Sequence, residues 1–107
     1  MFKKNNRYSF KKGMPAKSLN SQLFNLRFQE NNEGLKFAVI TGKKIDARAT
    51  VRNRLKRRFS EAFRKVLNSK IMNYSLVFFL KKELNNKTFT EMQAEIENIL
   101  KKAEILK

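Results

Sequence analysis

The sequence contains no cysteine, no histidine and no tryptophan, and it has only one proline. Without cysteine the chain can form neither a disulfide nor a thiolate metal site. Without histidine it lacks the commonest general base and the commonest zinc ligand. No apolar run reaches the roughly 20 residues that a helix needs to cross a bilayer, and the N-terminus lacks the apolar stretch of a signal peptide. We therefore expect a cytoplasmic protein with no membrane contact.

Acidic residues are scarce as well. Nine Asp and Glu stand against 25 Lys and Arg, which gives a formal net charge of +16, and the first acid is Glu30. An excess of this size implies a polyanionic partner. We expect no small-molecule substrate. With 107 residues, 41% of them hydrophobic, the chain can build a core of its own. We expect one domain that spans residues 1–107.

The few acids give little support to catalysis by the protein itself. Only Asp46 and Glu61 lie near the most basic segment, whereas hydrolysis of a phosphodiester by protein groups would require clustered carboxylates or a histidine pair. Asp46 fits a helix cap as well, and Glu61 an ion pair with Lys65 four positions on. A glycine-rich phosphate loop is also missing from the sequence. We expect neither a catalytic residue nor a metal site in the chain alone.

Two strands are expected in the first half of the chain. Alternating apolar and polar residues predict a half-buried strand over residues 22–29, and the stretch 35–41 predicts a second. The intervening "NNEG" is typical of a turn in which Gly34 supplies a positive φ. We expect these two strands to form an antiparallel hairpin.

The second half is expected to alternate helix and strand. Apolar residues at spacings of three, four and one predict a helix over about residues 48–68. The apolar run at 74–80 predicts a strand covered on much of both faces, and "LNNK" at 84–87 predicts a loop. Thr88 and Glu91 fit a capping box that opens a closing amphipathic helix. This order predicts an α+β fold with helices packed on a small central sheet.

The predicted helix at 48–68 is unusually basic. Its first half carries five cations within seven positions, with one asparagine among them: Arg52, Asn53, Arg54, Lys56, Arg57 and Arg58. A solvated face normally mixes both signs of charge, so this face indicates a phosphate-rich partner for the forked arginine side chains. Asn53 can read a base edge or bond a backbone group. A single helix beside a small sheet favours RNA modestly over DNA.

Aromatic residues add a second candidate site. Phe2, Tyr8 and Phe10 lie among lysines, where they can either stack single-stranded bases or pin the N-terminal segment to the sheet. Phe78 and Phe79 are successive on a predicted strand, so they are expected to point to opposite faces. One of them is expected in the core, and the other on an open sheet surface.

The stretch "KKIDARATVRNRLKRRFSEAFR" (residues 43–64) resembles the signature of the bacterial ribonuclease P protein subunit. The similarity extends to "FKKG" at 10–13, "KFAVITGKK" at 36–44 and "YSLVFFLKK" at 74–82. The resemblance implies a sheet that packs against the Arg-Asn-Arg helix through a left-handed βαβ crossover, against the general preference for right-handed ones. We expect a monomer in the absence of RNA.

The resemblance implies a function as well. In this family a large RNA is the catalyst and removes the 5′ leader of precursor tRNA with Mg²⁺ ions that the RNA mainly holds. The protein would bind that RNA through eight residues: Lys43, Lys44, Arg48, Arg52, Asn53, Arg54, Lys56 and Arg57. An aromatic cleft would bind the 5′ leader of precursor tRNA, with contacts from Phe10, Phe78 and Leu80.

Four positions depart from the family pattern. Asn6 stands where an aromatic is usual, Ser60 and Lys81 where arginine is usual, and Ser75 where aspartate is usual. None of these lies in the central motif. Two other functions compete with this reading of the sequence: a structural, ribosomal-type RNA-binding protein, and a protein-only nuclease, which the lack of histidine and paired carboxylates disfavours.

Overall fold

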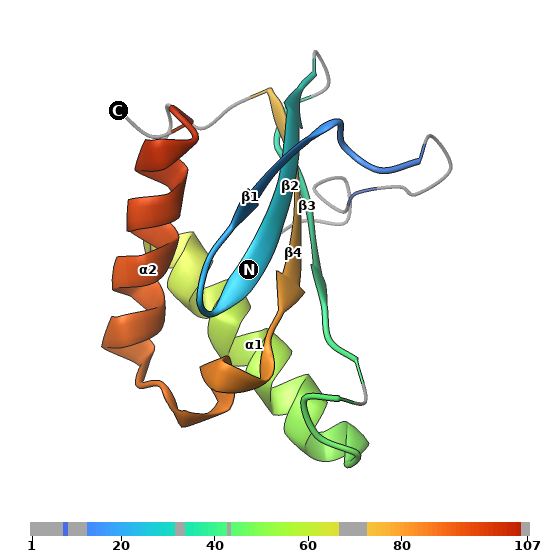
Figure 1. Ribbon diagram of the computed structural model, residues 1–107, viewed down its shortest axis with the longest axis vertical. Coiled ribbons are helices and arrows are strands. Elements are labelled where there is room, and N and C mark those ends of the chain that lie inside the picture. The colour runs from blue at the N-terminus through green and yellow to red at the C-terminus, as the bar shows by residue number, and fades with distance from the viewer. Residues whose placement is uncertain (1–7, 9–12, 32–33, 43, 67–72, 106–107) are drawn as a thin grey trace.

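The structure is a computed structural model that describes residue 8 and residues 13–31, 34–42, 44–66 and 73–105. In this part of the chain four strands form one sheet, and two α-helices and a short 3-10 helix follow the third strand in sequence (Figure 1). The elements are β1 (Lys17–Asn20), β2 (Phe24–Glu30), β3 (Lys36–Ile40), α1 (Ala49–Val66), β4 (Tyr74–Leu80), η3 (Lys82–Asn86) and α2 (Phe89–Lys102). The predicted α+β class is confirmed.

The strand order is β1-β2-β4-β3, so the predicted hairpin between β2 and β3 is wrong. Strand β4 lies between them, antiparallel to β2 and parallel to β3. The reason is burial: β4 is apolar along nearly its whole length, and a central position pairs both of its edges and keeps most of its side chains away from solvent. Gly34 nevertheless has the expected positive φ, of 87°.

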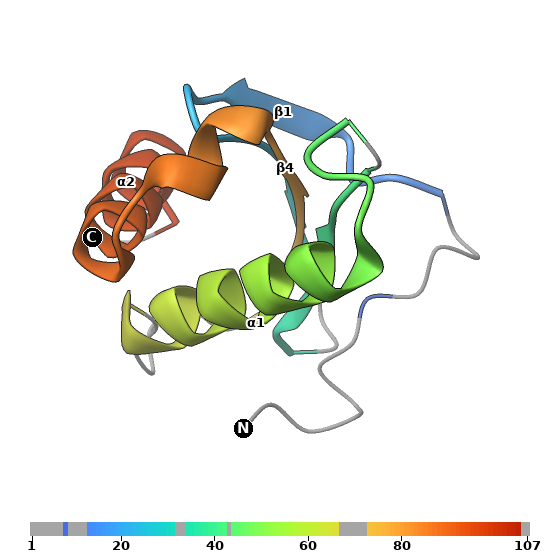
Figure 2. The same cartoon turned by 90° about the horizontal axis from the view of Figure 1, so that it is seen from below.

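Helix α1 connects the two parallel strands β3 and β4. Figures 1 and 2 show that this crossover is left-handed, as the family resemblance implied. Both α-helices lie on the same side of the sheet (Figure 2). This arrangement leaves the other side of the sheet without a helix among the described residues.

Two short elements were not expected from the sequence. Strand β1 is mostly exposed and polar, and its four residues pair antiparallel with residues 25–28 of β2. The predicted loop at 84–87 is replaced by η3, in which Leu84 is fully buried. Leu84 gives this polar stretch an anchor in the core, and the tight helical turn satisfies its backbone.

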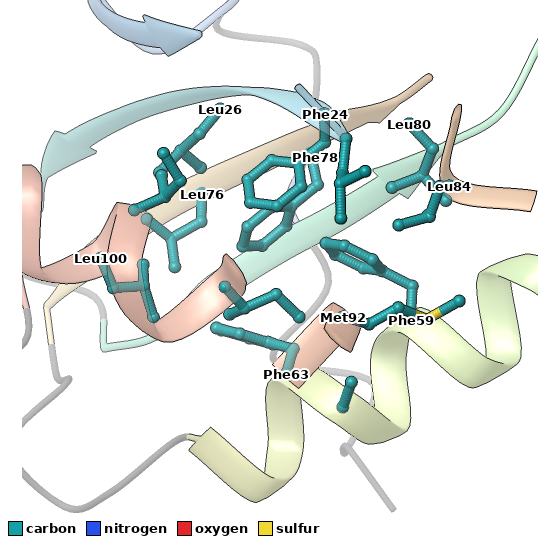
Figure 3. Packing of buried hydrophobic residues seen from close by; sticks show 14 of the residues in the cluster. Phe24, Leu26, Phe59, Phe63, Leu76, Phe78, Leu80, Leu84, Met92 and Leu100 are labelled. Atoms are coloured by element: carbon teal, nitrogen blue, oxygen red, sulfur yellow. The ribbon is translucent and has the colours of Figure 1, made fainter. Parts of the chain in front are cut away.

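The core lies between the sheet and the two helices, and phenylalanine rings form its centre (Figure 3). The ring of Phe78 lies 5.1 Å from those of both Phe59 and Phe63 and 5.5 Å from that of Phe24, centroid to centroid. Tilted and edge-on pairs of this kind stabilise a core beyond the burial of their apolar area. They fix α1 against the sheet.

The start of α2 carries the predicted capping box. The hydroxyl of Thr88 accepts a hydrogen bond from the amide of Glu91, and the Glu91 carboxylate accepts one from the amide of Thr88. The amide of Thr88, followed by its hydroxyl, lowers the pKa of Glu91. None of the described helices is long and apolar enough to cross a membrane.

Candidate nucleic-acid interface

Helix α1 has one buried side and one charged side. Leu55, Phe59, Ala62 and Phe63 are at most 3% exposed and face the sheet and α2. Their spacing places the residues between them on the opposite side of the helix. The exposed cations of α1 are Arg54, Lys56, Arg57, Arg64 and Lys65, and we call them the cationic face. The apolar stripe therefore holds the cationic face in one orientation on a rigid support.

The cationic face has few counter-charges. No described residue forms an ion pair or a hydrogen bond with the side chains of Arg54, Lys56 or Arg57. Glu61 approaches Arg64 at 3.9 Å, three positions on, and not Lys65 as the sequence predicted. Both partners are about half exposed, so this contact contributes little to stability. Like charges at this spacing repel each other, and an external polyanion would relieve that repulsion.

Arg52 differs from these cations because its side chain is engaged. Its Nη1 donates to the main-chain oxygens of Asp46 and Ala47, at 2.9 Å each. These carbonyls belong to the entry loop, residues 44–48, which leads from β3 into α1. Arg52 therefore fixes the entry loop, and only its remaining donors are available to a partner.

Arg48 and Asp46 form a pair within the entry loop. The Nε and Nη2 atoms of Arg48 donate to Oδ1 and Oδ2 of Asp46, at 3.1 and 3.0 Å, and the Arg48 amide also donates to Oδ1 at 2.8 Å. These hydrogen bonds lower the pKa of Asp46 from 3.8 to about 2. Asp46 was predicted as a possible helix cap. Its carboxylate instead closes a turn with the Arg48 amide, just before α1 begins at Ala49.

The entry loop is anchored to the core by a residue that the sequence analysis did not single out. Ile45 is only 6% exposed, and its carbonyl accepts a hydrogen bond from Nδ2 of Asn85 in η3, at 2.9 Å. Lys44 in the entry loop and Asn53 in α1 are both exposed. Lys43, the remaining predicted contact, lies outside the described residues.

Phe78 and Leu80 were predicted to contact the leader, but the structure buries both side chains, so they cannot form a surface for RNA. Phe78 is fully buried and Leu80 is only 7% exposed, and both belong to the core between the sheet and the helices. The cause is strand alternation, because Phe78 pairs with Leu26, which is itself fully buried. Phe10 lies outside the described residues.

The neighbouring residue Phe79 takes the open side of the sheet instead. This outcome confirms that the two successive phenylalanines point to opposite faces. Phe79 is partly exposed and lines a shallow groove of about 530 Å³. The described residues that line this outer groove are Met14, Ser18, Leu19, Asn20, Asn25, Arg27 and Phe79. An aromatic ring, an arginine and two asparagine amides in one groove can stack a base and bind its phosphate.

Side-chain contacts fix the borders of the outer groove. Nε of Arg27 donates to the carbonyl of Pro15 at 3.0 Å, and Nζ of Lys81 donates to Oδ1 of Asn20 at 2.7 Å. Lys81 also donates to the carbonyl of Ser21. The lysine that replaces the family's usual arginine therefore holds the turn between β1 and β2.

Tyr8 and Ser75 have structural contacts as well. The Tyr8 amide donates to the carbonyl of Phe37 at 3.0 Å, and its hydroxyl donates to the carbonyl of Gly13. These contacts favour a structural role for Tyr8, in which it pins the N-terminal segment to the sheet, over stacking on a base. Ser75 is 5% exposed, and its hydroxyl accepts a hydrogen bond from Nδ2 of Asn31 at 2.7 Å.

The sequence is similar to one known protein family along nearly its whole length. A sequence profile of the family described as Ribonuclease P matches residues 2–104. The ribonuclease P protein component of Clostridium kluyveri is 35% identical over 97 residues, which cover 86% of this chain and 84% of the relative. That of Clostridium novyi is 30% identical over 91 residues, which cover 82% and 80%.

Two solved structures show the same fold. The RNase P protein of Staphylococcus aureus matches with a TM-score of 0.71 at 24% identity, over 85% of this chain and 84% of that one. The RNase P protein of Thermotoga maritima matches with a TM-score of 0.72 at 24% identity, over 90% and 96%. With a family profile along nearly its whole length and relatives of at least 30% identity, the chain belongs to the ribonuclease P protein family.

Proposed function

We propose that the chain binds the catalytic RNA of ribonuclease P through α1 and its entry loop and thereby assists endonucleolytic removal of the 5′ leader from precursor tRNA in the cytoplasm. The observation that carries this proposal is the cationic face. Arg54, Lys56 and Arg57 are exposed on a helix that aromatic packing fixes to the sheet, and no described acid neutralises them. Such a surface binds phosphates with little reorganisation.

The leader of precursor tRNA is proposed to lie in the outer groove. Phe79 offers a ring for a base, and Arg27 and Asn25 offer donors from the neighbouring strand. The groove is shallow and open, as a single strand without fixed sequence requires. The cationic face and the outer groove lie on different sides of the sheet, so one protein can contact two RNA segments at once.

Mg²⁺ is proposed to be held by the RNA. Among the described residues, no three acidic, histidine or cysteine side chains gather into a possible metal site. The two acids near the RNA-binding elements, Asp46 and Glu61, are each in contact with an arginine. The protein would contribute positive charge and position, while the nucleotides would supply the metal ligands and the reacting groups.

A structural, ribosomal-type role is the alternative, and the family profile over residues 2–104 disfavours it. Reconstitution separates the two functions. Purified protein is added to a bacterial ribonuclease P RNA at low Mg²⁺ with precursor tRNA labelled at its 5′ end. We expect faster release of the leader with both components than with the RNA alone, and no release with the protein alone. Unchanged cleavage by the RNA, or cleavage by protein freed of all nucleic acid, would contradict the proposal.

A further inference from the structure

An acid sits among the arginines of the proposed RNA interface. Asp46 is 20% exposed at its side chain, and it lies between Lys44 and Arg48 in the entry loop. Its carboxylate lowers the attraction of this surface for every polyanion, because it cancels one of the few charges that precede α1. If the loop served only to attract RNA, an uncharged residue at this position would serve better.

The contacts of Asp46 instead control the geometry of Arg48. Two carboxylate oxygens meet Nε and Nη2 of Arg48 at 3.1 and 3.0 Å, which is the two-point geometry that fixes a guanidinium plane. A guanidinium carries five N–H donors, and this contact uses one edge of the group. The remaining donors of Arg48 stay accessible, because its side chain is 74% exposed.

Arg52 fixes the same loop from the helix side. Its Nη1 donates to the carbonyls of Asp46 and Ala47, so the two peptide units between the acid and Arg48 are held. Ile45 and its partner Asn85 hold the preceding residue. Arg48 therefore has a long, exposed side chain, and both its backbone and its guanidinium are held in place. This constraint reduces the conformational entropy that it would lose on meeting a phosphate.

We propose that Asp46 is a positioning residue that aims Arg48 at one phosphate of the structured RNA partner, and so favours this RNA over other polyanions. The inference rests on the proposed function, since it concerns the same interface. Asp46 itself touches no phosphate in this proposal. It acts through Arg48, at the cost of weaker attraction for RNA in general.

The chain offers a charge-matched control. Asp46→Asn and Glu61→Gln each raise the net charge by one near α1, but Glu61 makes only a 3.9 Å contact with Arg64. For each protein the dissociation constant is measured for a bacterial ribonuclease P RNA and for an unrelated folded RNA of equal length. We expect Glu61→Gln to tighten binding of both RNAs equally. Asp46→Asn should tighten only the unrelated RNA, so the ratio of the two affinities should fall about tenfold.

A second variant keeps the net charge constant. Arg48→Lys retains the cation but replaces the planar fork with a single ammonium, which cannot hold the two-point contact. We expect it to lose discrimination between the two RNAs to about the same extent as Asp46→Asn. In the Arg48→Lys background, Asp46→Asn should then leave the affinity ratio unchanged, because the two residues act as one unit.

The experiment separates failure of the positioning role from failure of the proposed function. Equal effects of Asp46→Asn and Glu61→Gln on both RNAs, or additive effects of Asp46→Asn and Arg48→Lys on the ratio, would overturn the positioning role and leave the proposed function intact. A wild-type protein that binds the two RNAs equally would overturn the proposed function itself.

Discussion

Arg52 and Asp46 are joined by a 2.9 Å hydrogen bond from the Arg52 guanidinium to the Asp46 carbonyl, across the junction between the entry loop and α1. The central motif of this family member therefore contains two kinds of cation. Arg52 has a partner in the fold, whereas Arg54 is exposed and has no described partner. The same residue type can thus contribute to stability at one position and to RNA affinity at the other.

This difference predicts that alanine substitution of Arg52 lowers thermal stability and that of Arg54 does not. Arg52→Ala removes both hydrogen bonds to the entry loop, so we expect the free energy of unfolding to fall by about 1 kcal/mol. The melting temperature should fall by about 4–8 °C for a domain of this size. Arg54→Ala should leave it unchanged or raise it slightly, because a repulsive charge is removed. Thermal unfolding followed by circular dichroism checks both variants, and an equal melting temperature for the two would refute the distinction.

The cationic face should determine how steeply RNA binding depends on salt. Each phosphate contact contributes about 0.9 to the slope of log affinity against log salt concentration on duplex nucleic acid. Arg54→Ala combined with Arg57→Ala should therefore lower the slope with ribonuclease P RNA by about 2. Filter binding between 50 and about 300 mM salt measures it.

Lys102→Ala with Lys82→Ala is the matched control, because it removes the same charge from exposed positions outside α1. This control should weaken binding only slightly and leave the slope nearly unchanged. If both double variants lowered the slope equally, net charge alone would explain binding and the cationic face would have no special role.

The capping box of α2 should affect stability without affecting RNA. Thr88→Ala leaves the amide of Glu91 without its side-chain acceptor and removes half of the reciprocal pair. We expect a loss of about 1 kcal/mol in the free energy of unfolding. Thr88→Ser keeps the hydroxyl and should recover most of it. Urea unfolding gives these values, and a changed salt slope for RNA binding in Thr88→Ala would show that α2 also contributes to the interface.

The sequence was informative where one segment determined its own structure. Helix α1, strand β4 and the capping box at Thr88 and Glu91 follow from local periodicity and local hydrogen bonds, and all three are confirmed. Strand pairing depends on segments far apart in the sequence. The hairpin between β2 and β3 was wrong because β4, over 40 residues beyond β2, takes the place beside it.

The same distinction between local pattern and long-range contact holds for the site residues. The exposed cations of α1 follow from the positions of its apolar stripe, but the contacts of Arg52 with Asp46 and Ala47 need the folded entry loop. The choice between Phe78 and Phe79 required the side of the sheet on which the helices lie. The alternation of side chains along β4 could be read from its sequence, whereas the position of the helices could not.

Low pH should weaken the contribution of Asp46 to stability. The hydrogen bonds from Arg48 lower the pKa of Asp46 from 3.8 to about 2, so the charged carboxylate stabilises the fold. A lowered pKa contributes stability that is present above pH 4 and is lost as the pH falls toward 2. The difference in melting temperature between wild type and Asp46→Asn should therefore shrink over this range. In an Arg48→Ala background it should vary much less, and a constant difference in the wild-type background would argue against the pair in solution.

Phe78 and Phe79 allow the strongest test of the outer groove, because they are adjacent and chemically identical. Phe78→Ala removes a ring that contacts three others in the core, so we expect it to lower the free energy of unfolding by about 3–5 kcal/mol. Phe79→Ala removes a partly exposed ring from the other side of the same strand. Its cost to stability should be clearly smaller.

The effect on RNA should be reversed. Stacking on an aromatic ring contributes about 1–3 kcal/mol per base, so Phe79→Ala should reduce the preference for precursor tRNA over leaderless tRNA at least about fivefold. Fluorescence anisotropy of the protein–RNA holoenzyme with both tRNAs measures this preference. Phe79→Tyr retains the ring and should preserve it. An unchanged preference in Phe79→Ala would place the leader elsewhere, because Phe79 is the one aromatic ring among the described residues that line the groove.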